Sequence, residues 1–264
     1  MEWENRDLQD LESAAELLES PGFIAKVSGL VGMPIEYVLD KLPKGAGDKI
    51  TNAVQVSLRA AVNTAAITLG RRGRGRPWLK SHMAAAGLSG GVGGVFGLAA
   101  LPIELPITTT IILRSIADVA RSEGEDLQAP EARLACLEVF AMGGPSAGDD
   151  ATESGYFAVR AALARAVSEA AKYVAGRTVV EDGAPVIVRL LAQIAARFNT
   201  VVGEKIIAQG VPVLGALGGA SINVLFIDHF QDMARGHFIV RRLERTYGEE
   251  EVRRKYDQLL AGRE

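Results

Sequence analysis

The stretch SHMAAAGLSGGVGGVFGLAALPI, residues 81–103, is rich in glycine and contains no Asp, Glu, Lys or Arg. A second stretch, IIAQGVPVLGALGGASINVLFI at residues 206–227, has the same character. Apolar runs of about 18 residues or more normally indicate a membrane-spanning helix. The glycines and prolines make both stretches poor candidates for that role. We therefore predict two Gly-rich helical hairpins, which are either buried in the fold or dip into a bilayer.

Glycine spacing and insertion energy support this interpretation. Gly87 and Gly91 are four residues apart, as are Gly215 and Gly219, so helices here would present flat faces that allow close packing. The larger apolar residues of the first run would contribute only about 3 kcal/mol to membrane insertion. Each glycine inside a helix costs about 1 kcal/mol relative to alanine, which offsets this gain. We do not expect the first run to span a membrane alone.

Bulk composition indicates a soluble protein with unusual apolar segments. The chain has 264 residues, of which 48% are hydrophobic and 23% charged, and its formal net charge is −3. An acidic chain is not typical of a nucleic-acid-binding protein, so no nucleic-acid partner is expected. The single cysteine, Cys136, excludes an internal disulfide and is predicted to be a packed thiol. The acidic N-terminus lacks a secretory signal, which favours a cytoplasmic location or the cytoplasmic face of a membrane.

Apolar residues recur three and four apart through most of the chain, which predicts an all-α fold of roughly ten helices. The predicted helices span residues 5–19, 34–42, 48–69, 77–98, 105–123, 130–142, 154–175, 185–208, 212–233, 238–247 and 249–260. Pro130 and Pro185 suit first turns, while Gly124 and Gly248 suit positions just after helix ends. We predict a single multi-helix domain.

The domain organisation follows from the turn-forming residues. We predict that residues 1–20 form an N-terminal helix and residues 21–264 the domain, with a flexible loop at residues 143–153. Residues 116–121 (IADVAR) resemble residues 230–235 (FQDMAR), which suggests an internal duplication with a pseudo-twofold axis. The same alignment places Arg114 opposite Asp228.

A basic segment lies just before the first Gly-rich run. Its members are Arg71, Arg72, Arg74, Arg76, Trp78 and Lys80. Basic residues with a tryptophan beside an apolar segment are typical of contact with an anionic lipid surface. A solvated basic loop is the alternative. Just after the run, Glu104 lies between Pro102 and Pro106 and is predicted either to meet an arginine at a kink inside the fold or to serve as a ligand-binding acid.

The richest polar group follows the second run. Its members are Asn223, Asp228, His229, Gln231, Asp232, Arg235 and His237. On a helix Asp228, His229 and Asp232 come close enough to suggest a weak divalent-metal site. The alternative is an ion-pair network with Arg114, Arg121, Arg235 and Arg241. Asp118 is likewise expected to pair with Arg114 and Arg121.

No established catalytic motif has its required context. Residues 87–91 match G-x-S-x-G, but no strand precedes them to form a nucleophile elbow. The P-loop, dinucleotide and H-E-x-x-H patterns are absent. We therefore expect no nucleotide and no cofactor.

Several blocks together resemble the EcsC family of bacterial proteins. They are residues 105–110, 116–121, 131–140, 211–223, 229–231 and 237–238. The resemblance covers most of the chain from about residue 21 onward. The family is named after a protein encoded beside the subunits of an ABC transporter, so the resemblance implies membrane association and a transporter link. It supplies no catalytic residues.

Three functions remain open. The first is a membrane-associated accessory protein, peripheral at the inner face, whose Gly-rich hairpins bind lipid or an apolar ligand. The second is a metal-dependent hydrolase that uses Asp228, His229, Asp232 and His237. The third is a structural partner of a membrane-protein complex. An enzyme is the less favoured class.

Overall fold

The computed structural model describes residues 3–20, 22–23, 26–27, 46–68, 81, 83–84, 101–143, 155–175, 184–209 and 215–262. These residues form eight helices and no strand, which confirms the all-α prediction for the described part of the chain. The helices are α1 (Asn5–Leu18), α4 (Ala46–Thr68), α6 (Leu101–Ser122), α7 (Pro130–Met142), α8 (Gly155–Val174), α9 (Pro185–Gln209), α10 (Gly215–Tyr247) and α11 (Glu249–Ala261).

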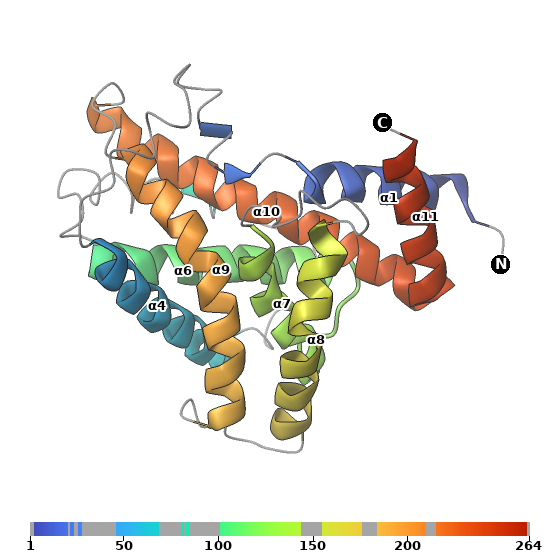
Figure 1. Ribbon diagram of the computed structural model, residues 1–264, viewed down its shortest axis with the longest axis horizontal. Helices are drawn as coiled ribbons and strands as arrows, with labels where there is room; N and C mark the ends of the chain where they lie inside the picture. Colours follow the sequence, from blue (N-terminus) through green and yellow to red (C-terminus); the bar gives the residue numbers. More distant parts are fainter. Residues whose placement is uncertain are drawn as a thin grey trace.

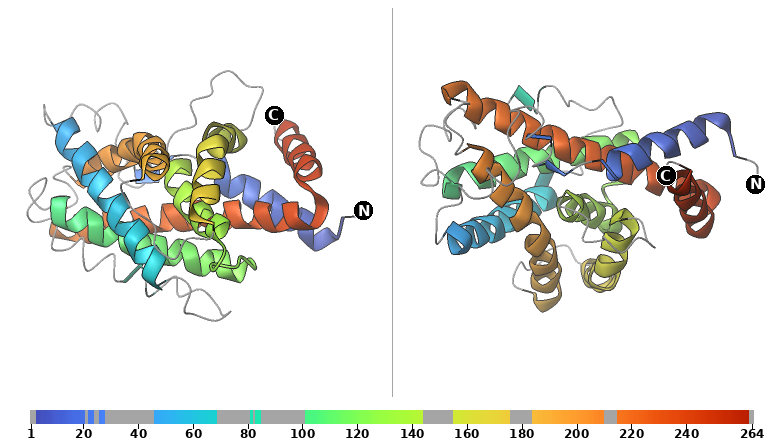
Figure 2. Two further views of the ribbon diagram at one scale, coloured as in Figure 1. Left: turned by 90° about the horizontal axis from the view of Figure 1, so that it is seen from below. Right: turned by 45° about the horizontal axis from the view of Figure 1, so that its top comes forward.

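Helix α10 is the axis of the fold. It has 33 residues, which correspond to roughly 50 Å at 1.5 Å per residue. Helices α1, α6, α7, α9 and α11 all pack against it (Figure 1). Helix α4 packs on α6 and α9, and α8 packs on α7 and α9. In both views of Figure 2, the starts of α6 and α10 and the end of α9 lie toward one end of the molecule, while α1 and α11 lie toward the other.

Local sequence signals explain several helix boundaries. Pro130 occupies the first turn of α7, where its missing N–H leaves no hydrogen bond unmade. Gly124 follows α6 with φ +84°, and Gly248 separates α10 from α11 with φ +89°. Residues other than glycine rarely adopt these left-handed conformations. The predicted stops at these two glycines are confirmed.

The predicted break in α10 between residues 233 and 238 is wrong. The helix continues through Gly236, where α1 crosses closely. A Cβ atom at Gly236 would lie 2.5 Å from Cγ of Leu18 and 3.1 Å from the carbonyl oxygen of Ala14. This glycine therefore allows close helix packing and does not end the helix.

Other predictions fall partly or wholly outside the described residues. These are the helix at 34–42, most of the helix at 77–98, and the loop at 143–153 beyond Gly143. The count of ten helices, the two complete hairpins and the twofold axis therefore stay predictions. In the proposed repeat, Arg121 binds Asp118 at 2.6 Å and Arg235 binds Asp232 at 3.1 Å, each pair three residues apart on its helix.

A cluster of phenylalanines holds the centre together. Phe140, Phe198, Phe226 and Phe230 come from α7, α9 and α10, and each ring contacts at least two of the others at centroid distances of 5.0–6.2 Å. Phe23 adds an edge contact to Phe226 at 5.3 Å. Aromatic pairs at such distances stabilise the fold beyond their burial of apolar area.

Helix α1 is bound to the C-terminal end of the molecule and is not set apart from the domain. Arg242 of α10 forms ion pairs with Asp7 and Asp10 of α1 and with Glu123 after α6. The Tyr247 hydroxyl donates a hydrogen bond of 2.8 Å to Asp7, and the Tyr247 ring stacks on Trp3. Residues near the two ends of the chain therefore stabilise each other.

Candidate functional site

A buried ion pair lies where both Gly-rich runs meet the described helices. Nζ of Lys205 lies 2.6 Å from Oε1 of Glu104, and both side chains are buried. Glu104 comes directly after residues 81–103, and Lys205 directly precedes residues 206–227. The prediction that Glu104 pairs inside the fold is confirmed, but its partner is a lysine of α9 where the sequence suggested an arginine.

The side chain of Lys205 is fully buried. Burial lowers the pKa of Lys205, and the charge of Glu104 opposes that shift. The ammonium also lies 5.1 Å from the ring centroid of Phe226, near the end of the second run. Three helices, α6, α9 and α10, therefore meet at one charged contact.

The first turns of α6 expose apolar side chains. Ile103 is 71% exposed and Ile107 is 49% exposed. Residues four apart lie on the same face of a helix, so these two side chains form one apolar surface. This surface continues directly from the first Gly-rich run in sequence.

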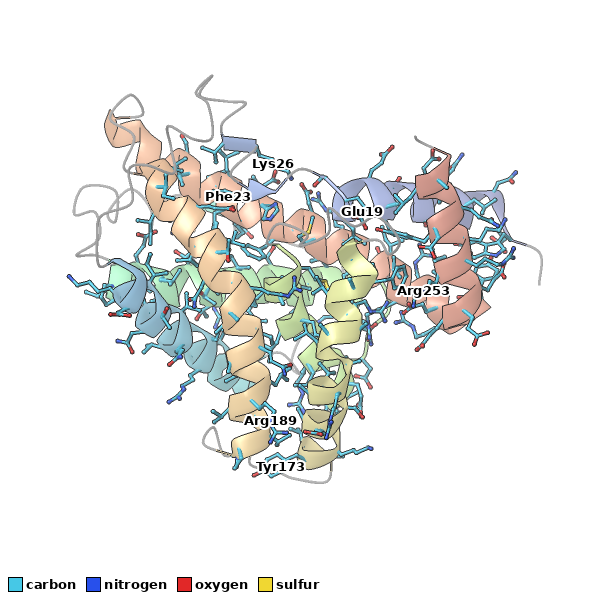
Figure 3. All side chains as sticks on the ribbon, in the orientation of Figure 1. Glu19, Phe23, Lys26, Tyr173, Arg189 and Arg253 are labelled. Carbon is cyan, nitrogen blue, oxygen red and sulfur yellow. The ribbon has the colours of Figure 1, made fainter. Side chains whose placement is uncertain are left out.

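The predicted polar group on α10 does not act as one site. Asp232 binds Lys26 at 3.0 Å and Arg235 at 3.1 Å, and Lys26 reaches it from the segment after α1 (Figure 3). Asp228 is half-buried, and its pKa is raised by burial and by the charge of Asp232. The charges of Lys26 and Arg235 oppose this rise. These contacts favour the ion-pair alternative over a metal site.

The imidazole of His229 binds the backbone at the end of α7. Its Nε2 lies 2.7 Å from the carbonyl oxygen of Gly143, so Nε2–H is the donor and neutral His229 carries its proton there. No group of three or more His, Cys, Asp or Glu that could hold a metal ion occurs among the described residues. The geometry gives no support to the metal-dependent hydrolase.

The burial of His229 predicts an acid-sensitive contribution to stability. Burial lowers the pKa of His229 from its usual 6.5 to about 4. Between pH 4 and pH 6.5, His229 is more often protonated in the unfolded chain than in the folded protein. The contribution of neutral His229 to the free energy of unfolding is therefore fully present above pH 6.5 and is lost as the pH falls toward 4. We expect the stability difference between wild type and His229→Gln to shrink in this window by up to about 1.4 kcal/mol per pH unit. Urea unfolding at several pH values measures it, and a difference that stays constant would contradict the prediction.

The remaining predicted residues on α6 and α10 have structural surroundings. Asn223 is buried. Arg121 binds Asp118, while Arg114 is exposed on the surface of α6. Arg241 also forms an ion pair, but its partner at 2.8 Å is Glu125, which lies outside the predicted polar group. Asp118, Arg121 and Arg241 are therefore engaged in ion pairs within the fold.

His237 belongs to a second polar centre that the sequence did not reveal. Its Nδ1 lies 3.0 Å from the hydroxyl of Tyr156, and Arg160 donates to the same hydroxyl at 3.3 Å. The Tyr156 hydroxyl can therefore donate to Nδ1, which leaves the proton of neutral His237 on Nε2. That nitrogen lies 4.0 Å from Oε2 of Glu138 and has no hydrogen-bond partner in the described part of the chain. Burial keeps the pKa of His237 well below its usual value.

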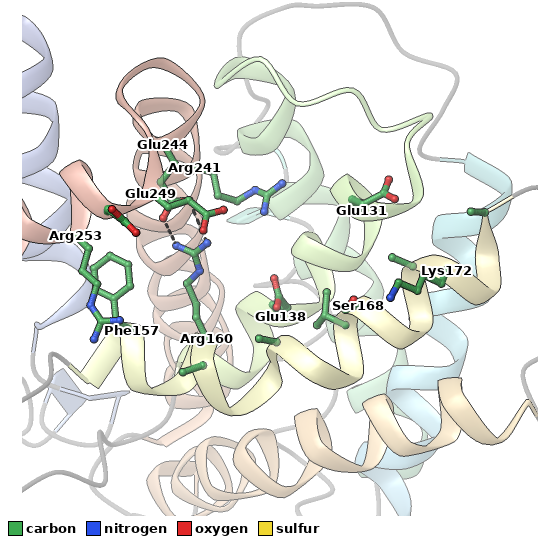
Figure 4. A pocket seen from close by; sticks show the side chains of 16 residues that line it. Glu131, Glu138, Phe157, Arg160, Ser168, Lys172, Arg241, Glu244, Glu249 and Arg253 are labelled. Atoms are coloured by element: carbon green, nitrogen blue, oxygen red, sulfur yellow. Dashed lines mark hydrogen bonds and ion pairs between the residues drawn. The ribbon is translucent and has the colours of Figure 1, made fainter. Parts of the chain in front are cut away.

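Glu138 faces a cleft between α7, α8, α10 and α11 with a volume of about 690 Å³ (Figure 4). Arg160 crosses the cleft and binds Glu244 through two contacts of 2.6 and 3.1 Å. Burial raises the pKa of Glu138, while Arg160 and Arg241 oppose the shift. One signal in the sequence could have revealed this residue, because Glu138 is the sole charge in the apolar segment at residues 134–142.

The membrane-surface candidates Arg71, Arg72, Arg74, Arg76, Trp78 and Lys80 lie outside the described residues. Among the helices described, residues Pro185–Ala208 of α9 are long and apolar enough to cross a membrane. Core helices of soluble proteins have the same composition, and α9 packs against α4, α7 and α8. This helix therefore adds little to the case for membrane contact.

Comparison with curated proteins and with solved structures gives no match. The model of the EcsC protein family matches residues 7–243. The match begins within α1, earlier than the resemblance in the sequence suggested, and ends before α11. It covers most of the 264 residues, so this chain belongs to the EcsC protein family.

Proposed function

We propose that this protein is a membrane-associated accessory protein of the cytoplasmic face, and that its Gly-rich runs bind lipid. The observation that carries the proposal is the exposed pair Ile103 and Ile107. Water-exposed isoleucines on one helix face favour contact with an apolar phase, because burying each side chain contributes roughly 1.5–3 kcal/mol.

The arrangement of helix ends supports the proposal. The start of α6, the end of α9 and the start of α10 lie toward the same end of the molecule (Figures 1 and 2). Both Gly-rich runs adjoin these helix ends in the sequence. They are therefore proposed to contact the membrane from the same end of the molecule. The ion pair between Lys205 and Glu104 joins α9 to α6 there, directly beside both runs in the sequence.

The sequence before the first run adds an electrostatic contribution. Arg71, Arg72, Arg74 and Arg76 precede the apolar segment. Each basic residue near an anionic leaflet contributes about 1 kcal/mol to membrane binding. Membrane affinity is therefore proposed to depend on both the apolar face and anionic lipid.

Vesicle flotation tests the proposal. The double variant Ile103→Glu with Ile107→Glu is expected to lower the partition coefficient about tenfold or more, because it removes apolar area and adds charge. Val188→Glu is the matched control, since Val188 is also exposed but lies near the start of α9, far from this face. Its flotation should equal that of the wild type.

A second set of variants separates the electrostatic part. Replacing Arg71, Arg72, Arg74 and Arg76 by glutamate should reduce flotation with anionic vesicles and leave binding to neutral vesicles unchanged. Circular dichroism checks that each variant is folded. The proposal would be contradicted if the wild-type protein did not float with vesicles, or if it floated no better than the Ile103/Ile107 double variant.

A further inference from the structure

The cleft between α7, α8, α10 and α11 is separate from the proposed lipid-binding end. Its residues come from four helices, and α11 lies outside the segment that the family model matches. One wall is the face of α8 that carries Ala161, Ala164, Ser168 and Ala171. These side chains are short, which leaves room for a ligand of small to moderate size.

Glu138 lies in this cleft without a hydrogen bond from the described residues. The residue is 7% exposed, and the Nε2 atom of neutral His237 lies 4.0 Å from its Oε2, too far for a hydrogen bond. Figure 4 shows the carboxylate directed into the space beside α8. Buried polar groups nearly always have a hydrogen-bond partner, so a bound donor is the expected explanation.

The charges around the cleft decide which ligand fits. Arg160 is bound by Glu244 and Arg241 by Glu125, so the charge of each guanidinium is already balanced by a carboxylate. The other lining glutamates are Glu131, Glu138, Glu249 and Glu250, against Lys172 and Arg253. The guanidinium of Arg253 lies over the ring of Phe157 at 5.5 Å. Negative charge is therefore in excess.

A metal ion is not the ligand that we expect in this cleft, although the charge would attract one. The part of the chain that the structure describes brings no three His, Cys, Asp or Glu side chains together as ligands. An ammonium group needs only one carboxylate and offers three donors. The alanine-rich wall of α8 suits a hydrocarbon chain attached to it.

We propose that this cleft binds a primary aliphatic amine, with its ammonium group at Glu138 and its carbon chain along α8. The ammonium donates to the carboxylate of Glu138, and the chain contacts Ala161, Ala164 and Ala171. The carboxylate thus gains the hydrogen bond that the described residues do not supply.

Calorimetric titration with n-hexylamine and with hexanoate tests this directly, because the two probes share a chain and differ in the charge of the head group. We expect saturable binding of hexylamine and none of hexanoate at the same concentration. Glu138→Gln should weaken hexylamine binding about tenfold or more, since a charge-assisted hydrogen bond contributes roughly 1.5–3 kcal/mol. Glutamine has the same shape and removes a buried charge, so the fold is expected to persist.

A second variant tests the cleft without touching its charges. Ala164→Leu fills the space along α8 and should abolish hexylamine binding, while Ala162→Leu is the control. Both alanines are exposed on α8, but only Ala164 lines the cleft. Equal binding of the two probes, unchanged binding in Glu138→Gln and Ala164→Leu, or no saturation at all would each overturn the proposal. The last result would leave water as the occupant.

Discussion

Replacing Lys205 by methionine is expected to lower the free energy of unfolding by about 3–5 kcal/mol. The substitution leaves the carboxylate of Glu104 buried without its ammonium partner, which lies 2.6 Å away in the wild type. Methionine nearly matches the length of lysine, so the loss of charge, and not a cavity, causes the effect. Urea unfolding followed by circular dichroism measures it.

The double variant Glu104→Leu with Lys205→Met is the control. Replacing a whole buried ion pair by apolar residues is often neutral or stabilising, because the desolvation penalty of both charges disappears. We expect its stability to lie near or above that of the wild type. If the double variant is as unstable as Lys205→Met alone, the contact between α6 and α9 depends on shape, and the electrostatic account is wrong.

Replacing Phe230 by alanine should also destabilise the protein by about 3–5 kcal/mol. The ring is fully buried and contacts Phe140, Phe198 and Phe226 at centroid distances of 5.2–5.6 Å. Its removal loses apolar contact area and leaves a cavity among α7, α9 and α10. Thermal and urea unfolding both report the change.

A double-mutant cycle with Gly143 shows whether the ring position is right. A Cβ atom at Gly143 would lie 2.7 Å from Cε1 of Phe230, so Gly143→Ala should cost about 1–3 kcal/mol in the wild type. In the Phe230→Ala background this overlap is gone, and the cost of Gly143→Ala should fall. Additive effects would mean that the two residues do not meet as described.

The all-α class was readable because apolar spacing of three and four residues depends only on neighbours along the chain. The burial of Glu104 was readable for a similar reason, since prolines and apolar residues flank it. Its partner was not, because Lys205 lies 101 positions away and reaches Glu104 only because α9 and α6 both pack against α4 and α10. Pairing between distant helices is a property of the tertiary structure.

The polar group at residues 223–237 shows why residues that are close in sequence do not always form one site. Along a helix of 3.6 residues per turn, neighbouring side chains point in different directions. Asp232 meets Lys26, His229 meets Gly143, and His237 meets Tyr156. The cleft was missed for the opposite reason, because four helices each supply a few of its residues and no stretch of sequence contains them together.

The attachment of α1 to Arg242 has a consequence for synthesis on the ribosome. Asp7 and Arg242 are separated by 235 positions, so at roughly 5–20 residues per second the first helix waits about 10–50 s for its partner. Helix α1 has an apolar face that includes Leu11, Ala14 and Ala15, and this face remains uncovered during that interval. Chaperones can bind the apolar face of α1 during this interval, and the docking of α1 on α10 is expected to come late in folding.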